Sequence, residues 1–205
     1  MGIKGSSQAQ SILSILLLTT VFLLFRYTVN PSTPPPVADK MPDSVDVISK
    51  LKVSVRQVSA RPAKLGVSVT NAHDGPVTIL SWNSPLDPLA LQLGVVSFVP
   101  AGSESDGSPI QIPTIQIRRR MPPGPESLVT IGAGQTREQE LELKEPIVPL
   151  EKLRGRRVAV VCRGEWISVW PSEADAITKV SLENAGASDD AFRGDFQSEA
   201  VEIEL

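Results

Sequence analysis

The stretch Leu65-Gly66-Val67-Ser68-Val69-Thr70 decides the fold class, together with the earlier stretch Leu51-Lys52-Val53-Ser54-Val55-Arg56. In both, apolar residues occupy every second position and polar or small residues stand between them. Because successive side chains of a β-strand point to opposite faces, this alternation predicts two half-buried strands. Turn residues follow at 71–75, and residues 76–82 resume as a strand. We therefore expect residues 65–70 and 76–82 to form a hairpin.

The rest of the chain beyond residue 82 repeats short apolar runs that Pro, Gly and Ser separate. The further expected strands are 89–99, 110–119, 128–131, 136–143, 157–163, 165–170 and 196–205. One short helix is expected after Trp170, with Ser172 as its N-cap and Gly186 as its stop. Regular short strands with turns between them are typical of an antiparallel β-sandwich. The expected fold class is mainly β, an antiparallel β-sandwich with one short helix.

An apolar, charge-free segment opens the chain. Its apolar centre is 12–25, between Lys4 and Arg26. A membrane helix needs about 20 residues, and 7–29 supply them; the same layout fits a secretory signal. Because no pair of small residues in an A-x-A-like pattern follows Phe25, an uncleaved signal anchor is favoured, with a cleaved signal peptide and a buried soluble helix as the alternatives. We therefore expect an N-terminal apolar membrane helix before the sandwich.

The expected domains are a signal anchor or signal peptide at 1–29, a Pro-rich linker at 30–45 and the β-sandwich domain at 46–205. Five prolines within the linker are typical of an extended, semi-rigid spacer. Lys4 and the α-amino group slightly outweigh Arg26, which favours a single-pass membrane protein with a lumenal or extracellular body. The body is secreted if the N-terminal segment is cleaved. A single Cys and the absence of a glycosylation sequon would instead suit a cytosolic body.

The composition excludes several kinds of site. The chain carries 20 Lys and Arg, 23 Asp and Glu, one His and one Cys, with a formal net charge of -3. Nucleic-acid binding needs a basic surface, so no nucleic-acid partner is expected. One His and one Cys form neither an intramolecular disulfide nor a Cys/His zinc cluster. We expect no catalytic residue, no cofactor and no metal site. A calcium site built from carboxylates alone is the one exception that the composition allows.

Several side chains that could carry chemistry also have structural interpretations. His73 is expected to be a turn residue and Cys162 a core residue. Three alternating acidic residues are expected on a solvated strand face, because like charges repel and stay hydrated. They are Glu138, Glu140 and Glu142.

Trp166 and Trp170 fall on one face of an expected strand. Large aromatic side chains most often fill a core, and we expect both indoles to be interior. Paired indoles also suit an alternative function, a carboxylate-dependent carbohydrate-active enzyme or a carbohydrate-binding module that uses the Trp166/Trp170 face.

The basic run Arg118-Arg119-Arg120 closes the expected strand 110–119, which Pro113 interrupts. A proline inside such a run predicts a bulged edge strand, and an open sheet edge can accept a partner strand. We expect the three arginines and the loop 121–126 to bind an unknown protein partner. As surface residues, each is expected to change stability by no more than about 0.5 kcal/mol when replaced by Ser.

Five motifs in order complete the pattern: Val67-Ser68-Val69-Thr70-Asn71, Pro76-Val77-Thr78-Ile79-Leu80, Ser84-Pro85-Leu86-Asp87, the segment 109–119, and Leu128-Val129-Thr130-Ile131 followed by Gly132-Ala133-Gly134-Gln135. In these motifs the stretch 51–143 resembles the N-terminal Ig-like pro-domain of fungal deuterolysin-type metalloendopeptidases. The peptidase half, with its H-E-x-x-H zinc helix, is absent. The whole chain looks like a stand-alone group of uncharacterised fungal proteins that share this domain. The resemblance implies an Ig-like sandwich that contacts protein surfaces, and the expected function is a non-catalytic, membrane-anchored or secreted protein-binding module.

Overall fold

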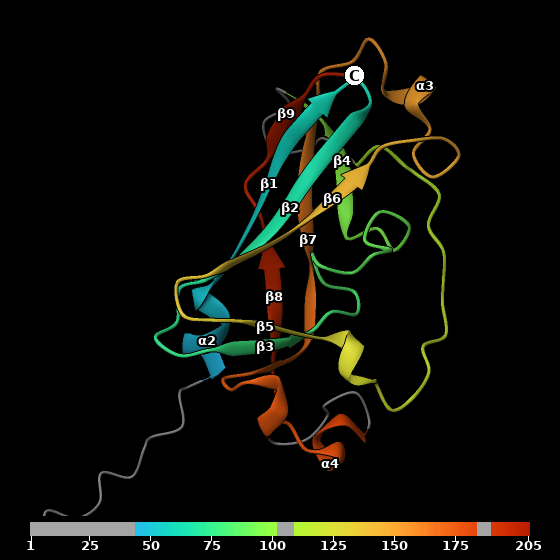
Figure 1. The fold of residues 1–205 in the computed structure, drawn as a ribbon. Helices are drawn as coiled ribbons and strands as arrows, with labels where there is room; N and C mark the ends of the chain where they lie inside the picture. The colour runs from blue at the N-terminus through green and yellow to red at the C-terminus, as the bar shows by residue number, and fades with distance from the viewer. Residues whose placement is uncertain (1–43, 102–108, 184–189) are drawn as a thin grey trace, which may run out of the picture. The chain divides into compact units, whose positions relative to one another are not determined.

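Two antiparallel sheets face each other in the computed structural model, which describes residues 44–101, 109–183 and 190–205 (Figure 1). These residues lie within one compact unit, Pro42–Leu205. The strands are β1 (Leu51–Ala60), β2 (Ala63–Asn71), β3 (Val77–Leu80), β4 (Val96–Pro100), β5 (Leu128–Ile131), β6 (Thr136–Glu142), β7 (Val158–Trp170), β8 (Phe192–Gln197) and β9 (Val201–Ile203). The short helices are α2 (Ser44–Lys50), α3 (Leu150–Leu153) and α4 (Lys179–Leu182), with single 3-10 turns η1 (Pro125–Ser127) and η2 (Ala174–Ala176). The mainly β, antiparallel class is confirmed.

The smaller sheet has the strand order β1-β2-β6. The alternation predicted from the sequence is present: Leu65, Val67 and Val69 are fully buried. Val55 lies opposite Val67, and Leu65 lies opposite Leu141, so apolar residues of all three strands share the inner face.

The larger sheet is built around β7. The first half of β7 pairs with β4 and β9, while its second half pairs with β3 and β8, and β5 adds to β3. The sequence predicted two strands here, 157–163 and 165–170, and they are one continuous strand. Gly164 stands at the expected break, where a Cβ would lie 2.9 Å from the ring of Phe196. The missing side chain therefore lets β7 pass close to that ring without interruption.

The predicted hairpin of residues 65–70 and 76–82 is wrong. β2 pairs with β1 and β6, whereas β3 pairs with β5 and β7 in the other sheet. The turn between them does form, and it carries the chain from one sheet to the other. Asn71 fixes it, because its buried amide donates to the carbonyls of Gly75 and Ile131 and accepts the His73 N–H.

Other predictions of secondary structure also need correction. Residues 110–119 form no regular strand; only Ile110 pairs, as an isolated bridge to Phe98. Within 89–99, the first half forms turns and the strand begins at Val96. The expected strand 196–205 belongs to two strands, β8 and β9. After Trp170 the chain makes η2 and α4, and Thr178 rather than Ser172 caps α4 through a bond to the Ser181 N–H.

One apolar core joins the two sheets. Its largest fully buried side chain is that of Trp166, which packs against Phe196 with ring centroids 4.6 Å apart. Trp170 and Trp82 are buried in a second, smaller cluster with Leu80. The prediction that Trp166, Trp170 and Cys162 are interior is therefore confirmed.

The predicted signal segment 1–29, with its membrane stretch 7–29, and nearly all of the linker 30–45 lie outside the described residues. Among the helices that the structure describes, none is long and apolar enough to span a membrane. The helix α2 begins at Ser44, two residues before the expected start of the sandwich domain.

Candidate interaction surface

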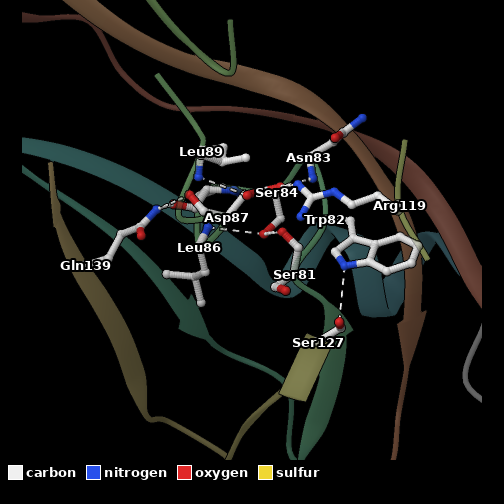
Figure 2. A network of polar contacts seen from close by, with 11 residues as sticks. Ser81, Trp82, Asn83, Ser84, Leu86, Asp87, Leu89, Arg119, Ser127 and Gln139 are labelled. Atoms are coloured by element: carbon white, nitrogen blue, oxygen red, sulfur yellow. Dashed lines mark hydrogen bonds and ion pairs between the residues drawn. The ribbon is translucent and has the colours of Figure 1, made fainter. Parts of the chain in front are cut away.

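A tightly folded loop follows β3 and surrounds one buried carboxylate. We name residues 81–94 the Asp87 loop. The side chain of Asp87 is fully buried and accepts hydrogen bonds from the backbone N–H groups of Asn83 (2.8 Å) and Leu89 (2.9 Å) (Figure 2). Ser84 adds a second set of contacts, since its hydroxyl donates to the Ser81 carbonyl and accepts the Leu86 N–H. The loop is therefore ordered from within by its own side chains.

Arg119 reaches into this loop from the segment that we name the basic segment, residues 109–121. Its guanidinium forms an ion pair with the Asp87 carboxylate and lies over the indole of Trp82, 5.5 Å from the ring centroid. The side chain of Arg119 is only a quarter exposed, and that of Asp87 is not exposed at all. Trp82 is held in turn by the bond from its Nε1 to the Ser127 hydroxyl, 3.1 Å long. Figure 2 shows these groups converging on the loop.

The Asp87 loop is also tied to the smaller sheet. The Gln139 amide, on β6, donates to the carbonyls of Pro85 (2.7 Å) and Asp87 (2.8 Å). The loop that holds Arg119 therefore contacts both sheets, and its backbone is fixed relative to the core.

The basic segment runs as a long trace on the right of Figure 1, and two backbone hydrogen bonds and one ion pair attach it to other described residues. The backbone N–H of Ile110 donates to Phe98 (2.7 Å), the N–H of Ile115 donates to Gln92 (2.9 Å), and the Arg119 side chain binds Asp87. Because Arg119 points inward, its neighbours Arg118 and Arg120 are exposed.

The sequence grouped Arg118, Arg119 and Arg120 as one binding surface, and the structure separates them. Arg118 and Arg120 face solvent, flanked by the exposed apolar side chains of Ile115 (46%) and Met121 (49%). Arg119 instead has a structural contact. Its partners Asp87 and Trp82 were not anticipated, although a carboxylate within the apolar run Pro85-Leu86-Asp87-Pro88-Leu89 is a signal that a buried partner is needed.

The proposed stacking face of Trp166 and Trp170 is not present. The two residues retain 1% and 2% of their surface, so neither indole offers a plane to a sugar ring. The alternative carbohydrate function that used this face is therefore wrong in its choice of site.

Cys162 is buried in the core, and His73 forms a hydrogen bond within a turn. Burial raises the pKa of the Cys162 thiol to about 12, so the thiol stays protonated at neutral pH. His73 lies in the turn after β2, where its Nδ1 accepts the Gly75 N–H at 3.1 Å. The expectation of a turn residue and a core residue is confirmed.

The acidic face of β6 is exposed, as expected, and cations neutralise it. Three pairs form: Arg56 with Glu138, Lys64 with Glu140, and Lys144 with Glu142. The hydrogen bond and the charge of Glu138 raise the pKa of Arg56. Arg56 reaches Glu138 across Gly66 of β2, whose Cβ would lie 3.0 Å from a Glu138 oxygen. In the part of the chain that is described, no group of three or more His, Cys, Asp or Glu side chains is placed to hold a metal ion.

Comparison with known proteins agrees with this architecture. The profile of the immunoglobulin-like domain matches residues 50–205. This chain belongs to the immunoglobulin-like domain family. An uncharacterized secreted protein of Arthroderma benhamiae is 33% identical to it over 159 residues, which cover 75% of this immunoglobulin-like chain and 77% of the relative.

Proposed function

We propose that this immunoglobulin-like protein is a non-catalytic binding module that acts outside the cytosol and docks a protein partner on its basic segment. The observation that carries the proposal is the contact of Arg119 with Asp87 and Trp82. It fixes the backbone between two exposed arginines, Arg118 and Arg120. A cationic surface that is already ordered loses less conformational entropy when a partner binds.

The charges of Arg118 and Arg120 are available to a partner. Within the described residues, neither arginine forms an ion pair with an acidic side chain. Guanidinium groups bind carboxylates through planar, paired hydrogen bonds, so an acidic protein surface suits them. Arginine is also enriched where protein interfaces have their strongest contacts.

Similarity to other proteins and the apolar run near the N-terminus support a protein-binding role outside the cytosol. The relative from Arthroderma benhamiae is described as secreted, and the apolar run 12–25 fits either a signal peptide or a membrane anchor. The motifs shared with the pro-domains of deuterolysin-type endopeptidases suggest a domain that contacts protein surfaces. The non-catalytic assignment is supported by the buried, protonated thiol of Cys162 and by the structural hydrogen bond of His73.

Cross-linking in the native cell tests the proposal. The full-length tagged chain is compared with the double variant Arg118→Ser/Arg120→Ser and with a control, Arg154→Ser/Arg156→Ser, which removes two exposed arginines from the α3–β7 connection. We expect the first variant to lose its cross-linked protein partner while the control keeps it, with both variants unfolding at the wild-type temperature. Equal capture by all three proteins would place the binding surface elsewhere.

A further inference from the structure

The basic segment carries backbone groups that no ladder uses. From Ile110 to Arg120 the described structure contains two backbone N–H donations, from Ile110 to Phe98 and from Ile115 to Gln92. The other backbone N–H groups of this stretch donate to no acceptor in the described part of the chain, and Pro113 has none to donate. Within the described part of the chain, these peptide groups at the surface of the β-sandwich therefore have no backbone partner.

The second half of the stretch is no regular strand, but its exposure alternates with the period of a strand. Gln116, Arg118 and Arg120 are exposed, whereas the intervening Ile117 and Arg119 are half-buried. This period of two is that of an extended chain. In an extended chain successive peptide groups also point to opposite sides, and the Ile115 N–H points at Gln92 of the body. From this alternation we infer that the N–H and C=O groups of residues 116, 118 and 120 lie on the side opposite the Ile115 N–H, away from Gln92.

The side chains beside this free edge select the partner's chemistry. Arg118 and Arg120 lie two residues apart on the outward face, and the exposed Ile115 and Met121 lie at either end of the stretch. Directly opposed side chains of two paired strands interact, and opposite charges stabilise the pair. The complement is an extended strand with acidic residues at every second position and apolar residues at its ends.

We propose that residues 115–121 form an acceptor edge that binds an extended acidic peptide strand of a partner protein by β-strand addition. The proposal rests on the proposed function and names the partner's form: main-chain hydrogen bonds provide affinity, and Arg118 and Arg120 provide the preference for acidic residues. The Arg119 contact with Asp87 holds the edge against the body before the partner arrives.

Peptide binding to the full-length chain tests strand addition. The probe is a fluorescent peptide in which glutamate alternates with valine. One matched peptide is N-methylated at alternate residues, which removes backbone donors and keeps the charge, and another has the same charge in an alanine-rich helical sequence. We expect the first peptide to bind and the other two to bind at least about tenfold more weakly.

Variants of the chain test the two parts of the edge separately. Gln116→Pro removes one outward N–H and keeps every charge, so we expect about fivefold weaker binding of the glutamate–valine peptide, the typical net value of one hydrogen bond. Gln116→Ala is its control and is expected to bind as the wild type does. Arg118→Ser/Arg120→Ser is expected to weaken binding about tenfold or more. If Gln116→Pro does not fold, the N-methylated peptide tests the complementary hydrogen bonds, which the peptide N–H groups donate to the carbonyls of this edge.

The outcomes separate this proposal from the proposed function. Equal binding of the N-methylated and unmodified peptides overturns strand addition and leaves a basic docking surface. Failure of all three peptides also overturns it, while cross-linking through Arg118 and Arg120 still decides the docking function. Binding of phosphatidylserine vesicles that depends on these two arginines, without peptide binding, overturns it in favour of an anionic lipid surface.

Discussion

Three consecutive arginines have two different environments, and this difference determines what their substitution does. Arg119 is paired with a fully buried carboxylate, whereas Arg118 and Arg120 are exposed. Removing one member of a buried pair leaves an uncompensated charge in the interior. The equal and small costs expected from the sequence therefore apply only to the two exposed arginines.

We predict that Arg119→Ser lowers the free energy of unfolding by about 2 to 3 kcal/mol, because Asp87 loses its counter-charge but keeps two backbone donors. Arg118→Ser and Arg120→Ser are expected to change it by at most about 0.5 kcal/mol each. Urea unfolding of the three single variants measures this. Three equal values would contradict the buried pair.

Cys162 gives a prediction about pH. Burial raises the pKa of its thiol to about 12, while the pKa of a cysteine in an unfolded chain is about 8.5. Below about pH 8.5 both states hold the proton; above it the unfolded state binds fewer protons, so stability falls as pH rises toward 12. We expect unfolding free energy to fall between pH 8 and pH 10 by about 2 kcal/mol more in the wild type than in Cys162→Ala, with a limiting slope of about 1.4 kcal/mol per pH unit. Parallel curves for the two proteins would show that the thiol does not contribute.

At the scale of elements, alternation predicted individual strands better than it predicted their partners. β1, β2 and β6 lie where period-two runs stand in the sequence. The pairing of β3 with β7 was missed, because a period identifies a buried face but does not say which strand covers it. The seven-residue helix α2 was missed because it is too short to establish a helical period.

The candidate surface was predicted only in part, for a similar reason. The basic run was visible in the sequence. Because its three residues are all arginines, their identity does not predict which side chain points inward. That direction depends on Asp87, 32 residues away in sequence, and only the fold brings the two together. The sequence could indicate that Asp87 needs a partner, yet not that Arg119 is the partner.

A substitution at Gly164 tests whether β7 passes close to the Phe196 ring. A Cβ at this position would lie 2.9 Å from Cζ of Phe196, whose ring packs on Trp166 and has little freedom to move. We expect Gly164→Val to destabilise the protein by about 1 to 3 kcal/mol through this overlap. The neighbouring Glu165→Val is the control: Glu165 is exposed and lies opposite Asp195, a like charge, so its loss is expected to cost nothing. Similar thermal midpoints for the two variants would contradict a tight β7–β8 contact.

At the scale of the whole molecule, the basic segment lies on a body whose net charge is negative. The exposed acids of β6 have cations of their own, so they do not compete for Arg118 and Arg120. With a net charge of -3 the chain has no general attraction for anionic surfaces. The proposed recognition by the two arginines therefore has to be local, which suits the proposed partner with a short acidic strand.

The last prediction concerns where this body is placed in the cell. The apolar run 12–25 predicts a signal anchor or a cleaved signal peptide, and Arg26 after it is not followed by a typical cleavage pattern. We expect the intact chain to remain with membranes after carbonate extraction and its residues beyond 30 to be released when the first 30 are deleted. N-terminal sequencing of the native protein decides the matter. A mature chain that begins near residue 30 would mean a cleaved signal, and the proposed partner of the basic segment would then be met in solution rather than beside a membrane.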